Sequence, residues 1–354
     1  MLDFTSALYL GLRHGTSSLR PWTALTTGVP AALREPPESA QIAMALAALI
    51  GVERATMARS TLHAFWDLFT AFDNEPRAIF VDAGAYPIAR WGTERTALSG
   101  VAVRAFGHHD PDALRARLRR AKVRERPWIV TDGYCTGCGR LAPLAEYGSI
   151  AREAGGRLII DDTQALGILG EHMSAKPPYG SGGGGSLRAT GTSGPHVLLA
   201  ASLAKGFGAP LCVIGGAMAA IDRFEAASET RVHASPPSLA DLHAAERALR
   251  INRESGDRLR RRLAALVARF RHALNRLGLT PGRSLFPVQR LAGITGQAAA
   301  ALYRRLEQLG VRAVLRRPAC ASNQELAFVI TAAHRSVQID RLVRQVRVAY
   351  SRAA

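Results

Sequence analysis

Residues 197–216 read VLLAASLAKGFGAPLCVIGG and predict two apolar strands joined by a glycine-containing turn that carries Lys205. An ammonium group at the end of a buried strand loses hydration, and this pushes the lysine toward its neutral amine. A neutral amine can form an imine with a carbonyl compound. The glycines that follow, Gly206 and Gly208, leave room for a ligand to approach the backbone closely. The alternative is a lysine that ends the strand and extends its ammonium group into water.

Lysine is rare in this chain, which narrows the choice of a reactive amine. The 46 basic residues include three lysines, Lys122, Lys176 and Lys205. Lys122 lies in the charged run LRRAKVRER, and Lys176 precedes two prolines in a predicted loop. If the protein uses a lysine amine for chemistry, we therefore expect that amine to belong to Lys205.

The net charge of +18 raises the question of a nucleic-acid partner. The excess is mostly arginine and is spread along the chain, with peaks at residues 115–126 and 258–262. Both peaks coincide with helical patterns that place the charges on a solvated face. Aromatic residues do not interleave with them as base stacking requires. We therefore predict no nucleic-acid partner.

Targeting signals are not evident in the sequence. The N-terminus MLDFTSALYLGLRHG lacks a basic start followed by an apolar run. The longest apolar run, residues 42–51, is too short to span a bilayer. We therefore expect no membrane span and a cytoplasmic, thiol-reduced protein.

The four cysteines do not form a disulfide pattern. Cys135 and Cys138 form a C-x-x-C pair, whereas Cys212 and Cys320 stand isolated in the sequence. A zinc site needs a second pair or a histidine pair at matching spacing, and we identify none. We therefore predict no metal site. We expect Cys135 and Cys138 to be two small residues that fill a tight loop, and a redox or metal role for them is the alternative.

Strand and helix patterns alternate over roughly residues 60–230, which predicts an α/β fold. The sheet is expected to be mostly parallel, with helices on both faces. A β-α-β-β-α pattern over residues 284–351 predicts a smaller α/β domain at the C-terminus. We therefore divide the chain into an N-terminal segment, residues 1–38, a large domain, residues 39–240, and a small domain, residues 241–354.

Residues 177–195 read PPYGSGGGGSLRATGTSGP. Low-complexity glycine- and serine-rich sequence is typical of flexible linkers. We therefore expect this segment to form a flexible excursion on the surface.

Two further features are consistent with a ligand site near Lys205. Asp161 and Asp162 end an apolar strand, and a carboxylate there can hold the proton of a pyridinium ring; a helix or turn cap is the alternative. Ser60, Thr61 and Leu62 can present backbone N–H groups at a helix N-terminus, as in phosphate sites, or form a plain cap. Because active sites of parallel sheets lie beyond the carboxyl ends of the strands, these groups are expected to meet.

The order of these motifs and their residue sequences resemble those of pyridoxal-phosphate enzymes of the aspartate-aminotransferase fold. Within this group, they resemble the α-oxoamine synthase family. The resemblance runs from YLGL, residues 9–12, to TAAH, residues 331–334, and the closing IDRL. Its most specific pieces are VTDGYCTGCGRLAPL at 130–144, LIIDDTQALGILGE at 158–171 and ASLAKGFG at 201–208. It implies fold type I of the pyridoxal-phosphate-dependent transferases and pyridoxal 5'-phosphate as cofactor.

The resemblance also implies roles for individual residues around the cofactor ring. Lys205 would hold the cofactor covalently and act as the proton-transfer base, and Asp161 would pair with the pyridine nitrogen. Tyr86 stands where the family stacks a histidine on the ring. Thr136 replaces a serine near the phenolic oxygen, and Gln164 replaces a histidine there, which removes a group that can titrate.

The cofactor phosphate would be held by Ser202 and by the backbone around Thr61 and Leu62. His233 lies where the partner subunit usually supplies a threonine to the phosphate. The resemblance thus implies a homodimer whose subunits share their sites.

Two departures from the family concern the substrate. The arginine that grips the amino-acid carboxylate corresponds to Ala327 in LAFVITAAH, and losing a bidentate clamp is a large change. Arg316 or Arg317 is a possible replacement, although we expect surface solvation for both. The glycine-rich stretch that follows YLGL in the family is replaced by residues 23–37.

The primary functional interpretation is a decarboxylative condensation of an amino acid with an acyl thioester, carried on CoA or on a carrier protein. The basic surface suits either acidic donor. An alternative is an aminotransferase for an amine or an amino acid held without the usual arginine. A third interpretation is a non-catalytic relative that keeps the fold.

Overall fold

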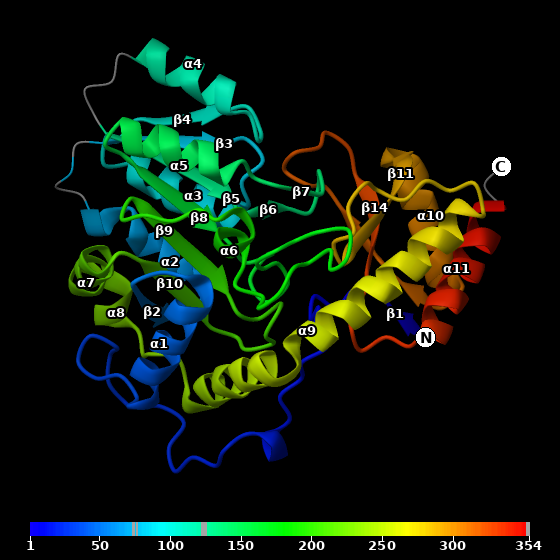
Figure 1. Ribbon diagram of the computed structural model, residues 1–354, viewed down its shortest axis with the longest axis horizontal. Coiled ribbons are helices and arrows are strands. Elements are labelled where there is room, and N and C mark those ends of the chain that lie inside the picture. Colours follow the sequence, from blue (N-terminus) through cyan, green and yellow to red (C-terminus); the bar gives the residue numbers. More distant parts are fainter. Residues whose placement is uncertain (73–74, 76, 122–125, 352–354) are drawn as a thin grey trace.

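The computed structural model describes residues 1–72, 75, 77–121 and 126–351 of the chain. Lys122, one of the three lysines, lies outside the described residues. Figure 1 shows a larger lobe, which contains the central sheet, and a smaller lobe, which contains the N-terminal strand and the last helix. The long helix α9 (Leu239–Asn275) runs from one lobe to the other.

The larger lobe is organised around a seven-stranded sheet in the order β2-β10-β9-β8-β5-β3-β4. All its pairings are parallel except those of β10, which is antiparallel to β2 and to β9. The strands are β2 (Arg54–Ala58), β3 (Arg77–Asp82), β4 (Val103–Phe106), β5 (Arg126–Asp132), β8 (Arg157–Asp161), β9 (Val197–Ser202) and β10 (Cys212–Gly216). The predicted mostly parallel sheet is therefore confirmed.

The middle residues of the central strands are mostly apolar, since both faces of the sheet are covered. Successive residues point to opposite faces and join different cores. In β5, Ile129 belongs to one hydrophobic cluster, whereas Trp128 and Val130 belong to the other. This double burial fixes the direction in which the last residue of each strand faces.

Helices of the larger lobe cover the sheet. They are α1 (Glu38–Ile50), α2 (Thr61–Leu68), α3 (Pro87–Ala97), α4 (Pro111–Ala121), α5 (Leu144–Glu153), α6 (Ser186–Thr190), α7 (Met218–Ala227) and α8 (Glu229–His233). A short hairpin, β6 (Tyr134–Cys135) and β7 (Arg140–Leu141), follows β5. The caps follow the sequence pattern: Ser60 caps α2, and Ser238 forms a capping box with Asp241 at α9.

The smaller lobe contains an antiparallel sheet in the order β11-β14-β13, with α10 (Gly296–Gln308) and α11 (Ser336–Ser351). Its strands are β11 (Val288–Thr295), β13 (Val314–Arg316) and β14 (Glu325–Val329). The N-terminal strand β1 (Leu2–Asp3) pairs in parallel with β12 (Val311–Arg312). The division at residues 38 and 240 remains a prediction.

The expectation of a flexible surface excursion over residues 177–195 is wrong. Tyr179 and Ser186 are buried, at 2% and 0% exposure, and residues 186–190 form α6. Gly183 lies at a φ of +74°, and a side chain there would collide with the guanidinium of Arg260. The glycines therefore serve close packing of backbone segments and not chain flexibility.

Among the described helices, none combines the length and the hydropathy needed to cross a membrane.

Candidate active site

A cavity of about 560 Å³ lies at the carboxyl ends of β5, β8 and β9. Seven of the nine predicted site residues line it: Thr61, Tyr86, Thr136, Asp161, Gln164, Ser202 and Lys205. The other two predicted residues do not line the cavity. Leu62 is 43% exposed on α2, and His233 is exposed at the end of α8. Residues from distant parts of the sequence thus meet where the parallel strands end, as expected for such sheets.

Lys205 follows β9 in the turn predicted from the sequence. Its Nζ lies 5.7 Å from the centre of the Tyr86 ring. Burial lowers the pKa of Lys205, an effect that the carboxyl groups of Asp161 and Asp132 oppose and that Arg316 reinforces. The amine therefore loses its proton more readily than a solvated lysine, which favours nucleophilic chemistry.

Two carboxyl groups lie side by side at the floor of the cavity. Asp132 ends β5 directly opposite Asp161 in the parallel pairing with β8. Asp161 accepts a hydrogen bond from the backbone N–H of Thr163 at 3.0 Å, and Asp132 accepts one from the N–H of Tyr86 at 3.0 Å. Burial raises the pKa of both groups, and the charge of Asp161 raises that of Asp132 further. The two neighbouring carboxyl groups therefore hold protons more tightly than solvated aspartates do.

Asp162, the second member of the predicted pair, does not reach the cavity. It is fully buried and accepts hydrogen bonds from the backbone N–H of Ser186. Asp162 therefore holds the start of α6, whereas Asp161 lines the cavity.

Gln164 is oriented by the N-terminal segment. The hydroxyl of Tyr9, in the YLGL motif, donates to Gln164 Oε1 at 2.6 Å. Burial raises the pKa of Tyr9, so it remains a hydrogen-bond donor. With its oxygen engaged in this way, Gln164 keeps its amide N–H groups as donors toward a ligand.

The wall formed by α2 and the turn after β9 suits an anion. Thr61 is the first residue of α2, where the first backbone N–H groups of a helix have no partner within it. Ser202 lines the same cavity, and its backbone N–H donates to Thr163 Oγ1 at 3.0 Å. Hydroxyl donors and a helix N-terminus, combined with a lysine and a buried aspartate, fit the donor set that pyridoxal phosphate requires.

The expectation that Arg316 is a solvated surface residue is wrong. Its guanidinium donates to Thr136 Oγ1 at 2.7 Å, to Thr136 O at 2.9 Å and to Glu325 Oε1 at 2.7 Å. Ala327 is fully buried within β14, so its position offers nothing to a ligand. The neighbouring strand β13 instead brings the Arg316 side chain into the cavity wall, and exposed Arg317 follows at its edge.

Sequence reasoning missed two contributors to the site, Asp132 and Thr163, and named Arg316 only as a possible replacement clamp. The signal for Asp132 was present, because it ends a buried strand as Asp161 does. No local pattern distinguishes Arg316 from a surface arginine, since its place depends on the pairing of β13 with β14 in the other lobe.

The expectation that Cys320 is isolated is also wrong. Its Sγ lies 3.5 Å from that of Cys135, which itself lines the cavity. His108 joins the same group through its contact with Cys138. The cysteines of the C-x-x-C loop therefore contact a third cysteine and a histidine, and do not only fill space in a tight loop.

Comparison with known proteins identifies the family of this chain. The family model described as aminotransferase class I and II matches residues 34–346. An 8-amino-7-oxononanoate synthase of Halorhodospira halophila is 32% identical over 263 residues, which span 72% of this chain and 61% of the relative. The match thus covers less than two thirds of that relative's length.

Two solved structures share the fold. A serine palmitoyltransferase from S. paucimobilis, solved with bound PLP-myriocin aldimine, superposes with a TM-score of 0.85 at 18% identity, covering 99% of this chain and 87% of that one. An 8-amino-7-oxononanoate synthase from Francisella tularensis gives 0.76 at 18% identity, covering 99% and 98%. These likenesses confirm the predicted fold class.

Proposed function

Because this chain belongs to the aminotransferase class I and II family, we propose that it binds pyridoxal 5'-phosphate around Lys205 and acts as a transferase on an amino acid. The proposed reaction is decarboxylative condensation of the amino acid with an acyl thioester, the chemistry of the α-oxoamine synthases that the motifs resemble. The observation that carries the proposal is the meeting of Lys205, Asp161 and five other predicted residues in one cavity. The name of the Halorhodospira relative supports the same reaction class.

Pyridoxal phosphate supplies an electron sink for negative charge on the carbon next to the substrate nitrogen. Lys205 would hold the cofactor through its amine and, once a substrate amine replaces it, move a proton at that substrate carbon. Its lowered pKa suits both tasks, because the neutral amine is the nucleophile and the base. Asp161 would hold the proton of the ring nitrogen from its buried position.

The other residues bind and orient. Thr61 and Ser202 would donate to the phosphate at the α2 end of the cavity. Tyr86 would place an aromatic face on the cofactor ring. Gln164, oriented by the Tyr9 hydroxyl, would donate to the phenolic oxygen.

Arg316 takes the place of the missing clamp in this proposal. Thr136 and Glu325 fix its guanidinium at the cavity wall, and its Nε is buried with no hydrogen-bond partner among the described residues. A carboxylate bound there would form charge-assisted hydrogen bonds. Exposed Arg317, at the edge of the same cavity, suits the phosphates of a CoA or carrier-protein donor.

We further propose a cytoplasmic homodimer. His233, exposed at the end of α8, would then contact the cofactor phosphate in the partner's site. In the dimer, each cavity would be completed by two chains.

The test is a spectral screen of the purified protein with added cofactor. We expect visible absorbance from a cofactor imine in the parent protein and in Lys176→Ala, whose lysine is exposed. Lys205→Ala should lose this absorbance. A protein that ignores the cofactor would refute the proposal and favour a non-catalytic relative.

The products then distinguish decarboxylative condensation from transamination. Condensation releases CO2 and free thiol when an amino acid and an acyl thioester are supplied together. Transamination converts the cofactor to its amine form with an amino donor alone, and the absence of an arginine at position 327 keeps this alternative open. Amine-form cofactor without thiol release would establish the aminotransferase instead.

A further inference from the structure

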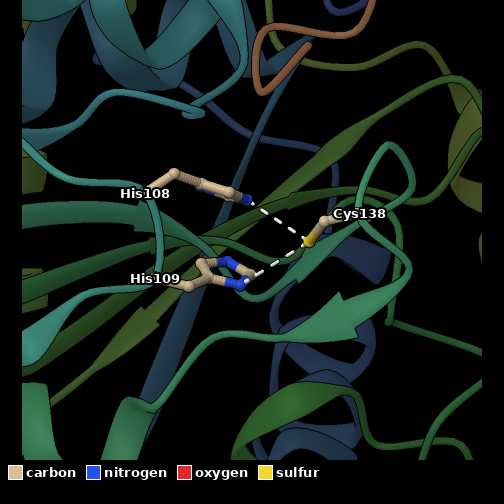
Figure 2. A group of neighbouring side chains, drawn as sticks. All are labelled: His108, His109 and Cys138. Atoms are coloured by element: carbon tan, nitrogen blue, oxygen red, sulfur yellow. Dashed lines mark hydrogen bonds between the residues drawn. The ribbon is translucent and has the colours of Figure 1, made fainter.

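Five histidine and cysteine side chains, of the kinds that bind metal ions, lie close together between the two lobes. Cys135 lines the cavity of the candidate active site, and the other four lie next to it. Cys135 and Cys138 lie on the β6–β7 hairpin, and His108 and His109 follow β4. Cys320 comes from the loop between β13 and β14 of the smaller lobe, 185 residues beyond Cys135. Figure 2 shows both imidazole rings directed at the sulfur of Cys138.

Two of the distances between these ligand atoms match those in a tetrahedral zinc site. Zinc–sulfur and zinc–nitrogen bonds of about 2.0–2.3 Å place ligand atoms roughly 3.3–3.8 Å apart. His108 Nε2 lies 3.3 Å from Cys138 Sγ, and Cys135 Sγ lies 3.5 Å from Cys320 Sγ. The ligand atoms of His108, Cys135 and Cys320 all lie within 4.8 Å of one another, as do those of His108, His109 and Cys138.

The histidine is held in the manner of a metal ligand. His108 Nδ1 bonds to Asp82 Oδ1 at 2.6 Å, which leaves Nε2 facing the sulfur atoms. Asp82 is buried and also accepts the backbone N–H groups of Gly84 and His109. A carboxylate behind a histidine fixes the tautomer and raises the basicity of the ligating nitrogen.

The surrounding backbone is shaped to bring these groups together. A side chain at Gly84 would collide with the ring of His108, and one at Gly137 would collide with Cys320 Sγ. His109 adopts a φ of +53°, a left-handed conformation that is uncommon outside glycine and that clusters at functional sites. Both glycines and the strained histidine therefore serve the cluster.

A backbone donor also faces one of the sulfur atoms of the cluster. The N–H of Cys138 points at Cys135 Sγ, at 3.5 Å. Thiolates are the form in which cysteine binds metal ions.

We propose that Cys135, Cys138, Cys320 and His108 bind one Zn²⁺ ion. Each thiol gives up its proton to solvent on binding, and the cysteine sulfurs and His108 Nε2 complete a closed tetrahedron with no open position. A set of three thiolates and one imidazole excludes Mg²⁺ and Ca²⁺, which prefer oxygen ligands. The site is structural, since no position remains for a substrate.

The ion would connect the lobes at the edge of the active site. Cys320 lies four residues after Arg316, which ends β13, and Thr136 lies between the two hairpin cysteines. Arg316 donates to Thr136 from across this junction. Zinc would therefore hold the end of β13, with Arg316, against the hairpin.

The test measures metal in the full-length protein purified without chelator. We expect one zinc per chain by inductively coupled plasma mass spectrometry, and a loss of at least tenfold in zinc affinity in Cys138→Ser and in Cys320→Ser. The matched control is Cys212→Ala, which removes a buried thiol in β10 and should keep the zinc. A chelator should lower the melting temperature of the parent protein and of the control, but not that of Cys320→Ser.

A second measurement does not depend on folding of the variants. Co²⁺ added to the chelator-treated parent protein should give the visible bands and the thiolate charge-transfer absorbance of a tetrahedral sulfur-rich site. A protein without metal whose Co²⁺ spectrum lacks those bands would overturn the proposal. A Cys135–Cys320 disulfide found by mass spectrometry of the freshly purified protein, or iron with inorganic sulfide in place of zinc, would overturn it as well.

Discussion

Replacing Asp162 by asparagine should remove a large part of the pH dependence of stability. Asp162 is fully buried behind the active site and accepts the backbone N–H of Ser186 at 3.0 Å. Burial raises the pKa of Asp162 from 3.8 to about 7. The folded protein therefore binds this proton more tightly than the unfolded chain, so stability is lost as the pH rises from the unfolded pKa through the folded one.

The magnitude follows from the size of this shift. A pKa raised from 3.8 to about 7 corresponds to about 4 kcal/mol at ~1.4 kcal/mol for each pH unit. Linkage places about 2.5 kcal/mol of this loss between about pH 5 and about pH 8. The asparagine side chain of the variant cannot ionise, yet its carbonyl can still accept the N–H of Ser186.

The assay is urea unfolding followed by tryptophan fluorescence at several pH values between about 5 and 8. From the low to the high end, the free energy of unfolding should fall by about 2.5 kcal/mol less in Asp162→Asn than in the parent protein. The matched control is Asp112→Asn, whose carboxylate is 93% exposed and should leave the slope unchanged. Parallel pH profiles for the parent protein and Asp162→Asn would refute the reasoning.

Three further outcomes are expected. Tyr9→Phe should lower the free energy of unfolding by about 0.5–1.5 kcal/mol in urea titrations, because it removes the hydrogen bond to the half-buried amide oxygen of Gln164; an unchanged midpoint would contradict this. Because burial lowers the pKa of Lys205, its reductive methylation, followed by peptide mass spectrometry, should have a lower pH midpoint than that of a free lysine amine in solution. Equal midpoints would argue against a sheltered amine. Arg316→Gln should raise the KM for the amino acid by roughly 10- to 100-fold with a smaller change for Arg317→Gln, the size expected for a lost charge-assisted hydrogen bond; a reversed order would assign the clamp to Arg317.

The parts of the site that the sequence predicts are those fixed by the large sheet. Asp161 and Lys205 each follow an apolar run that is buried on both faces, so the end of the run also marks the edge of the sheet. Asp132 obeys the same rule, because it ends β5 in register with Asp161. Local pattern is sufficient here, since each strand determines where its own last side chain faces.

The parts of the site that local sequence patterns do not locate depend on contacts between segments far apart in the chain. Arg316 reaches Thr136 across 180 residues, and Cys320 reaches Cys135 across 185. The hydrophobic periodicity of one segment does not predict which distant segment it will contact. Whether a loop from the smaller lobe reaches the hairpin is decided by packing between the lobes.

The glycine-rich segment was misinterpreted for a different reason. Composition alone does not distinguish a solvated linker from backbone packed against backbone, because both favour glycine. The deciding partner is Arg260 on α9, which donates to Gly167 O at 2.9 Å and leaves no space for a side chain at Gly183. Its position is set by a helix that begins more than 40 residues later.

Pairing of β1 with β12 has a consequence for how the protein is made. Leu2 finds its partner Val311 only after more than 300 further residues have been synthesised. At ribosomal rates of roughly 5–20 residues per second, this strand waits on the order of 15–60 s. Tyr9, which orients Gln164, is tethered to the same strand. The large sheet can therefore assemble on the ribosome, whereas the catalytic pocket reaches its final form only when translation is almost over.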